Sequence, residues 1–310
     1  MKKTGKRLLA AMLLFCTILI GAAGYEVMAA DEAQSTESTS GTVNSADDLP
    51  GKRIGVQLGT TGDIYVSDYE SDGSGTVVER YNKGADAIQA LKQGKIDCVV
   101  IDEQPAIKFV EQNTGIRILD EEFTIEEYAF VIAKDNTELL DKVNSVLEKL
   151  EADGTIANIQ KNYIGTEDEI GKFPYESKDV SHENGTLTVG TNAEFPPYES
   201  YEDGQIVGID MDIMRAVSDE LGMELKIEDM AFDSIIPAIS TGKVDIGAAG
   251  FTVTEERKKN VNFTDTYTTS KQVIIVKDDT VTSEKAGLSE KFYDNFVKDS
   301  RYVYLLKGLG

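Results

Sequence analysis

The chain has 310 residues, a length that accommodates two domains, and its formal net charge is −24. Such an acidic chain disfavours nucleic acids and anionic lipid surfaces as partners. It contains one histidine, His182, and two cysteines, Cys16 and Cys98. Cys16 lies in an N-terminal run that we expect to be removed, which leaves Cys98 alone, and His182 lies in a predicted linker. We therefore expect no disulfide framework, no zinc site, and no Ser-His or Cys-His catalysis.

The N-terminus has the pattern of a secretory signal. Basic residues between positions 2 and 7 precede an apolar run from Leu8 to Ala23, and small residues precede a cleavage site near Ala29 or Ala30. The run of about 16 residues is shorter than the roughly 20 that span a bilayer, which favours removal over a retained anchor. The signal over 1–29 predicts an exported protein at the extracytoplasmic face of the cell membrane.

Strands and helices are predicted to alternate after an acidic, Ser/Thr-rich linker over 30–48. Apolar runs predict strands at 52–57, 96–101 and 128–134. Amphipathic spacing predicts helices at 84–94, 103–113, 136–154 and 155–165. A second polar linker covers 166–186. The alternation indicates an α/β fold with largely parallel sheets.

Residues 246–265 are the most informative stretch. An apolar run over 244–249 predicts a buried strand that ends at Gly250, where backbone groups can approach a ligand closely. Thr252 then offers a hydroxyl, and Arg257 follows on a predicted first helical turn. A guanidinium can hold a carboxylate bidentately, so the stretch predicts a receptor for a small carboxylate. A surface helix with a solvated arginine is the alternative.

With residues 189–222 and 232–250, this stretch resembles lobe 1 of the polar amino-acid binding proteins, solute-binding family 3, which serve ATP-binding-cassette importers. Residues 49–63, 95–106 and 128–165 resemble lobe 2 and the C-terminal helices of the same family. The resemblance implies a periplasmic-binding-protein type II fold, with two lobes of mixed, mostly parallel sheets around a central cleft. Because lobe 2 comes first here, we expect a circularly permuted lobe order; two truncated tandem domains are the alternative.

The expected boundaries are a signal peptide at 1–29, a linker at 30–48, lobe 2 at 49–134, C-terminal helices packing on lobe 1 at 135–165, a linker at 166–186, lobe 1 at 187–278 and a tail at 279–310. The permutation is expected to cut one crossover between the lobes, to leave the one near 129–134 intact, and to bring 274–278 beside 49–53. The tail resembles the segment before the first membrane helix of the importer's permease. It implies a fused permease or a separate amphipathic segment; an ordinary surface helix is the alternative.

The resemblance assigns the two charged ends of an amino acid to opposite lobes. It implies that Arg257 clamps the ligand's carboxylate with help from Thr252 and the backbone of Thr61. It also implies that Asp102 meets the ammonium, with the carbonyl of Gly250 as a second acceptor. A helix N-cap is the alternative or additional role for Asp102.

The ligand's side chain is expected further along the cleft. Phe195 and Phe232 occupy the positions that sandwich it in the family, although an aromatic residue alone is more often core. Asn192, Glu194 and Gln57 map near its end.

Asp210 and Asp212 are spaced like a metal pair, but the family uses this stretch structurally. We therefore expect no calcium and no cofactor.

The implied function is binding of a polar or basic L-amino acid for import, by hinge closure, with a permease subunit and its ATPase as partners and without catalysis. Two other classes stay open. One is a dehydratase on the same fold, for which Glu194 is the candidate acid–base residue, and turnover assays discriminate it. The other is a sensor module in front of a signalling membrane protein, and the sequence that follows Gly310 would distinguish a sensor from an import protein.

Overall fold

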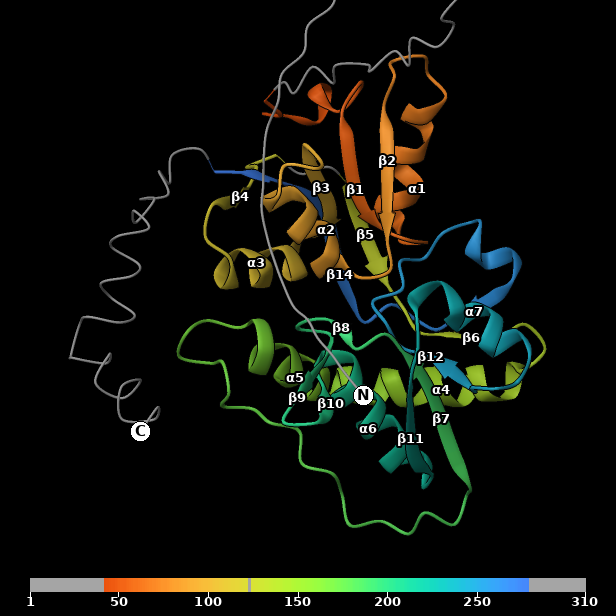
Figure 1. Ribbon diagram of the computed structural model, residues 1–310. Coiled ribbons are helices and arrows are strands. Elements are labelled where there is room, and N and C mark those ends of the chain that lie inside the picture. The colour runs from red at the N-terminus through yellow and green to blue at the C-terminus, as the bar shows by residue number, and fades with distance from the viewer. Residues whose placement is uncertain (1–41, 122–123, 279–310) are drawn as a thin grey trace, which may run out of the picture. The chain divides into compact units, whose positions relative to one another are not determined.

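The computed structural model describes residues 42–121 and 124–278, and all of them fall in one compact unit, Thr39–Gly310. The expected signal peptide, most of the first linker and the tail lie outside the described residues. Within this unit two α/β halves lie one above the other (Figure 1). None of the helices in the described ranges combines the length and the apolar character that a membrane span needs.

The first half, which we call the six-stranded lobe, is built on a sheet of order β2-β1-β3-β14-β4, with β5 also paired to β14. β1 runs parallel to β2 and β3, whereas β14 runs antiparallel to β3, β4 and β5. The strands are β1 (Arg53–Gln57), β2 (Val77–Tyr81), β3 (Cys98–Asp102), β4 (Ile116–Ile118), β5 (Thr124–Tyr128) and β14 (Thr268–Lys277).

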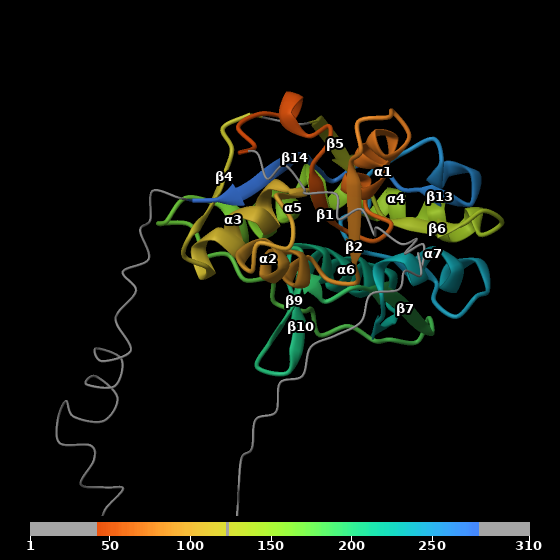
Figure 2. The same cartoon turned by 45° about the horizontal axis from the view of Figure 1, so that its top comes forward.

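Helices cover both faces of this sheet, because alternate apolar residues of its strands point to opposite sides. Val99 and Ile275 pack with α2 (Gly84–Lys92) and α3 (Glu103–Gln112). Val100 and Ile274 pack on the other face with Val66 of α1 (Thr61–Ser67) and with the segment near the short helix η1 (Ala46–Asp48). A second short helix, η2 (Asp68–Glu70), follows α1. Figure 2 shows this arrangement from a second side.

The second half, which we call the five-stranded lobe, has the sheet order β11-β7-β12-β6-β13, and a small sheet β10-β9-β8 lies beside it. β7 is parallel to β11 and β12, and β6 is antiparallel to β12 and β13. The strands are β6 (Val131–Ala133), β7 (Thr186–Thr191), β8 (Glu194–Phe195), β9 (Glu199–Glu202), β10 (Gln205–Val207), β11 (Glu224–Asp229), β12 (Ile246–Gly247) and β13 (Val261–Phe263).

The five-stranded lobe is also covered on both faces. Ile132 and Val189 pack on one side with three helices, α4 (Thr137–Ala152), α5 (Thr155–Ile164) and α6 (Ile209–Leu221). Val131 packs on the other side with α7 (Phe232–Ser240). The two helices after β6 therefore pack on this lobe, as the resemblance implies.

The predicted strand at 128–134 is in fact two strands that belong to different sheets. β5 ends at Tyr128 in the six-stranded lobe, and β6 begins at Val131 in the five-stranded lobe. Because β6 and β14 enter their sheets antiparallel to neighbours, the sheets contain fewer parallel pairs than the alternation of strands and helices predicts.

The assignment of 268–278 to lobe 1 is wrong, and so is the expectation that one crossover is cut. The apolar strand β14 lies in the interior of the six-stranded sheet, so the chain crosses back to that lobe through residues 264–267. The two crossings are hydrogen-bonded to each other: the N–H of Tyr267 donates to the Tyr128 carbonyl at 3.0 Å, and that of Thr264 donates to the Phe130 carbonyl at 3.0 Å. Both connections between the lobes are covalent.

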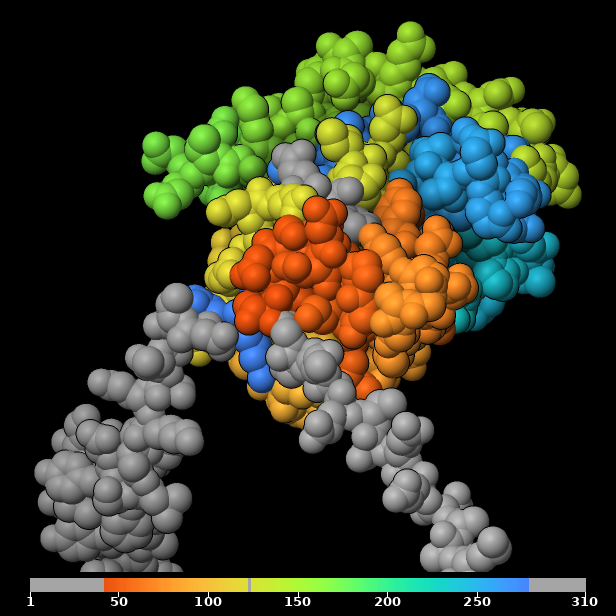
Figure 3. Space-filling view, turned by 90° about the horizontal axis from the view of Figure 1, so that it is seen from above, coloured from red at the N-terminus to blue at the C-terminus, as the bar shows by residue number. Residues whose placement is uncertain are grey.

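The end of β14 does lie close to the first described residues. Ile274 and Val276 belong to the same buried cluster as Leu49 and Ile54. Figure 3 shows the blue atoms at the end of β14 near the red atoms of the first described residues. The two strands are not neighbours in the sheet, however, because β3 lies between β1 and β14.

Candidate functional site

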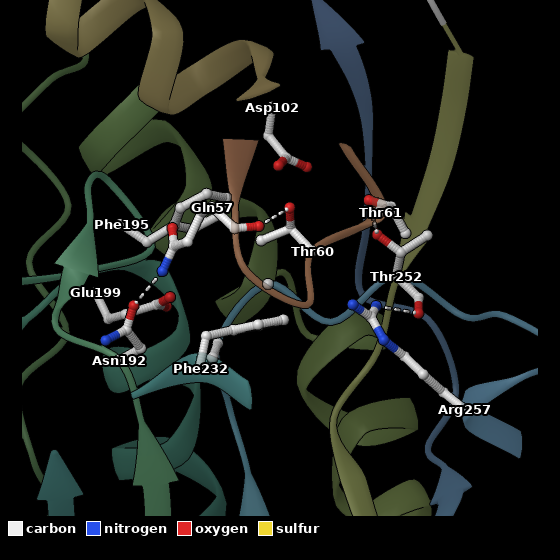
Figure 4. Close-up of a pocket in the computed structure, with 12 residues that line it drawn as sticks. Gln57, Thr60, Thr61, Asp102, Asn192, Phe195, Glu199, Phe232, Thr252 and Arg257 are labelled. Atoms are coloured by element: carbon white, nitrogen blue, oxygen red, sulfur yellow. Dashed lines mark hydrogen bonds between the residues drawn. The ribbon is translucent and has the colours of Figure 1, made fainter. Parts of the chain in front are cut away.

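A cavity lies between the two lobes (Figure 4). The six-stranded lobe contributes Gln57, Thr60, Thr61 and Asp102, and the five-stranded lobe contributes Asn192, Phe195, Glu199, Phe232, Ala249, Gly250, Thr252 and Arg257. Nine of the ten residues expected at the site therefore line one cavity.

Arg257 is buried at the start of the short helix η3 (Arg257–Lys259), with 7% of its surface exposed. Its Nη1 donates to the Thr252 carbonyl at 2.9 Å, and its Nη2 donates to the Gly59 carbonyl at 3.0 Å. The guanidinium also lies 5.4 Å from the centroid of the Phe232 ring. Burial lowers the pKa of Arg257, but a guanidinium stays protonated in proteins. These contacts fix a desolvated positive charge at one end of the cavity.

Asp102 ends β3 and immediately precedes α3. Its side chain makes no capping hydrogen bond to that helix, so the N-cap role is not observed. The carboxyl group instead accepts a hydrogen bond from the Tyr128 hydroxyl. Burial, followed by the nearby Glu126 carboxylate, raises the pKa of Asp102 to about 7. A cationic group of a ligand beside Asp102 would lower this pKa again, because an opposite charge stabilises the ionised carboxylate.

Glu199, which the sequence analysis did not single out, lines the cavity from β9. The residue is 0% exposed, and neither carboxylate oxygen has a hydrogen-bond partner among the described residues. Burial, then Asp210 and Asp102, raise the pKa of Glu199 well above its usual value. A buried carboxyl without a partner costs free energy, so this corner favours a ligand that donates hydrogen bonds or carries positive charge.

The lining residues divide into two ends. Figure 4 shows Arg257, Thr252 and Thr61 on one side of the cavity, and Glu199 with Asn192 on the other. Two direct contacts between side chains join the lobes at the cavity. Gln57 Nε2 donates to Asn192 Oδ1 at 2.8 Å, and the hydroxyl oxygens of Thr61 and Thr252 are 3.5 Å apart.

Glu194 does not line this cavity, contrary to the sequence-based expectation. Its carboxylate instead forms a partly exposed ion pair with Lys83 of the other lobe. Because Glu194 does not line the cavity, we assign it no role in recognition. Thr60 and Ala249, like Glu199, line the cavity without having been predicted.

The two expected aromatic residues line the cavity and also belong to two buried clusters of the five-stranded lobe. Phe195 stacks on Tyr198 with ring centroids 5.7 Å apart, and Phe232 stacks on Phe251 at 4.7 Å. Both rings are therefore core residues that also line the cavity.

Gly250 adopts a left-handed backbone conformation with φ +56°, and a Cβ atom there would lie 2.8 Å from Phe195 Cε1. Its N–H donates to Asp210 Oδ2 at 2.9 Å, and the Tyr267 hydroxyl donates to Asp210 Oδ1 at 2.5 Å. Asp212 accepts from Arg215 at 2.5 Å. Both aspartates thus have structural partners, and within the described ranges no cluster of His, Cys, Asp and Glu could hold a metal ion.

The model of the bacterial extracellular solute-binding proteins, family 3, matches residues 74–166 and 187–300. These two segments make up more than half of the chain, and the chain therefore belongs to this family. Its members are binding proteins, and the fold is the type II periplasmic-binding-protein fold, with two lobes around a cleft.

Individual relatives match only part of the chain. It is 44% identical over 27% of its length to the arginine-binding protein ArgT of Corynebacterium glutamicum. It is 40% identical over 30% of its length to the arginine-binding extracellular protein ArtP of Bacillus subtilis. The matched part spans 28% and 36% of these two relatives. A solved ancestral arginine-binding protein bound to glutamine is 49% identical over 26% of this chain and 36% of its own, with a TM-score of 0.26.

Proposed function

We propose that this chain binds an L-α-amino acid with a cationic side chain in the cavity between its lobes. The observation that carries the proposal is the distribution of buried ionisable groups in the cavity lining: one guanidinium, that of Arg257, and two carboxyl groups, those of Asp102 and Glu199. An amino acid of this class carries one negative and two positive groups, which match these three charges.

The α-carboxylate is assigned to Arg257, with the hydroxyls of Thr252 and Thr61 as further donors. The α-ammonium is assigned to Asp102, whose pKa is raised by burial in the absence of a cation. Because Arg257 comes from the five-stranded lobe and Asp102 from the six-stranded lobe, the ligand would join the lobes through its own two charges. This supports hinge closure about the paired crossings as the binding motion.

The ligand's side chain is assigned to the end formed by Glu199, Asn192 and Gln57. Glu199 offers two carboxylate oxygens without partners, which suits the fork of a guanidinium or an ammonium group. This refines the expectation of a polar or basic ligand, and it places the acidic partner at Glu199 instead of Glu194. The arginine-binding relatives support the same ligand class.

Import by an ATP-binding-cassette transporter is the physiological role that we assign to this binding, at the extracytoplasmic face of the membrane. The family and the predicted signal peptide support it. The permease and its ATPase would be the partners, and a permease fused after the tail belongs to the same proposal.

We also propose that the lobe order is circularly permuted. The first described strand and the last, β1 and β14, share one sheet, and the segments next to them share one buried cluster. Closely spaced termini are the geometry that permits permutation. A variant that joins 278 to 49 through a short linker and opens within 166–186 should fold and bind the same ligand; its failure to fold would argue for another origin.

A screen of the full chain against the twenty amino acids tests the binding proposal. A ligand at 100 times its dissociation constant stabilises by about 2.7 kcal/mol, which raises the melting temperature measurably. We expect L-arginine or L-lysine to give the largest shift and D-arginine a much smaller one. The proposal is wrong if leucine or phenylalanine binds more tightly than every basic and polar amino acid.

A further inference from the structure

An ion pair joins the two lobes outside the cavity. Lys83 follows β2 of the six-stranded lobe and directly precedes α2, and its ammonium group pairs with the carboxylate of Glu194 on β8 of the other lobe. Their side chains are 50% and 30% exposed, so the pair lies at the protein surface. Neither residue lines the cavity, and the amino-acid binding proposed above uses neither of them.

The two residues of β8 have different surroundings, because successive side chains of a strand point to opposite faces. Phe195 lines the cavity, whereas Glu194 lines a groove outside it. Both lobes form this groove, through Phe109 and Gln112 of α3 on one side and Pro197 and Tyr201 on the other. The ion pair therefore lies on the groove side of β8, at the rim of the cleft.

A buried contact between the lobes lies next to this ion pair in both segments. Gln57 Nε2 donates to Asn192 Oδ1 at 2.8 Å across the lobes, and Asn192 comes two residues before Glu194. The same nitrogen donates to the carbonyl of Asn82, the residue before Lys83, at 3.2 Å. The ion pair thus continues a line of contacts that begins in the cavity wall.

Strand order places the ion pair away from the two crossings between the lobes. Lys83 follows β2, the edge strand of its sheet, and β1 and β3 separate β2 from β14, which continues from the second crossing. Three strand spacings correspond to about 14 Å. In the other lobe, β12 separates β7, which leads to β8, from β6, which continues from the first crossing. A rotation about the crossings moves distant atoms furthest, so the ion pair separates early when the cleft opens.

We propose that Lys83 and Glu194 form a latch that slows opening of the closed cleft and thereby slows release of the bound amino acid. The proposal rests on the amino-acid binding function proposed above. The latch stabilises the closed form alone, because its two partners belong to different lobes. A contact that must break before the ligand leaves lowers the dissociation rate, and the latch does so without touching the ligand.

The release rate is measured by loading the full chain with labelled L-arginine and chasing it with an excess of unlabelled L-arginine. Lys83→Gln removes the charge of the latch and keeps most of the length of the side chain. Lys142→Gln is the matched control, because Lys142 forms an exposed ion pair with Glu138 inside α4 of one lobe.

In dilute salt Lys83→Gln should release L-arginine roughly two- to five-fold faster than the wild type, as expected for a partly exposed ion pair. Glu194→Gln should have a smaller effect, because Asp229 of the same lobe also acts on the charge of Lys83. Salt at about 0.5 M should bring the wild type close to the rate of Lys83→Gln, because it screens exposed charges. Lys142→Gln should release the ligand at the wild-type rate under both conditions.

Exchanging the two charges separates a latch from a general structural role. Lys83→Glu alone places two carboxylates opposite each other and should release the ligand faster than Lys83→Gln. Combining Lys83→Glu with Glu194→Lys should restore slow release, because the pair is formed again with its charges exchanged. A double variant that releases as fast as Lys83→Glu would overturn the inference.

Equal release rates in the wild type, Lys83→Gln and Lys142→Gln in dilute salt would also overturn it. Such a result, with L-arginine bound by all three proteins, would remove the latch and leave the proposed function in place. If no amino acid binds to the wild type, the proposed function fails and the latch fails with it.

Discussion

Nη2 of Arg257 lies 3.0 Å from the carbonyl oxygen of Gly59, a residue 198 positions earlier in the chain and in the other lobe. The same guanidinium holds the Thr252 carbonyl of its own lobe at 2.9 Å. One buried cation that lines the cavity therefore contacts both walls of the cleft. This arrangement supports the proposal that Arg257 holds the lobes together and binds the ligand's carboxylate.

Replacing Arg257 by alanine should weaken binding of L-arginine by about 2–5 kcal/mol, because the ligand carboxylate would then be buried without its cation. This corresponds to a loss of roughly 30-fold or more in the dissociation constant, measurable by calorimetry. Lys258→Ala is the matched control, since Lys258 is exposed and forms a surface ion pair with Glu255. Affinity like that of the wild type in Arg257→Ala would remove Arg257 from the site.

Replacing Glu199 by glutamine should change which ligand is preferred. We expect the wild type to bind L-arginine more tightly than its neutral analogue L-citrulline by at least about 2 kcal/mol, because the buried carboxyl lacks any other cationic partner. Glu199→Gln should abolish most of that preference. Glu202→Gln, an exposed acid on the same strand, should leave it intact. Competition binding with the two ligands measures the ratio, and an unchanged ratio in Glu199→Gln would argue against the assigned partner.

Replacing Gly250 by alanine should destabilise the protein by about 1–3 kcal/mol and weaken binding, because the new Cβ would meet the Phe195 and Tyr128 rings at 2.8 and 3.2 Å. Gly204→Ala separates backbone strain from this clash: Gly204 also has positive φ, +80°, but a Cβ atom there would have nothing within 4 Å. Urea unfolding should show the larger loss for Gly250→Ala. Equal losses would mean that the contact with Phe195 is easily relieved.

The unliganded protein should lose stability as the pH rises from about 4 to about 7. Burial raises the pKa of Asp210 to about 7, although bonds from Tyr267 and Gly250 act in the opposite direction. In that pH window the folded state binds more protons than the unfolded state, so a rising pH removes the stabilisation, by up to about 4 kcal/mol for this group. Asp102 also contributes to this loss of stability with rising pH, because burial raises its pKa as well.

Urea unfolding of Asp210→Asn at about pH 5 and about pH 8 measures the contribution of this group. The difference in the free energy of unfolding between the two conditions should be smaller in Asp210→Asn than in the wild type. Asp203→Asn, a change at an exposed turn residue whose left-handed backbone tolerates asparagine, should keep the full difference. A difference that persists unchanged in Asp210→Asn would assign the pH dependence to other carboxyl groups.

Local sequence patterns were sufficient to predict helices α2, α3, α4 and α5 and to single out three residues that line the cavity together. Gly250, Thr252 and Arg257 lie within eight residues of one another, so a short pattern of strand end, glycine, hydroxyl and cation was enough to identify them. The helix predicted at 136–154 is α4, Thr137–Ala152, because its apolar spacing matches the helical period over four turns.

Packing between segments that are distant in the sequence determines which acidic residues are buried in the cavity lining and which sheet each strand joins. Glu194, Glu199 and Glu202 are chemically alike and lie within nine residues, yet Glu194 pairs with Lys83, Glu199 is enclosed, and Glu202 is exposed. Burial depends on what packs around a side chain, and Glu199 has sequence-distant neighbours from both lobes, Asp210 of its own lobe and Asp102 of the other. The same reason applies to β14: its apolar residues predict a buried strand, but nothing local specifies the sheet that buries it. Pairing with β3 and β5, across 140 residues or more of sequence, determines that sheet.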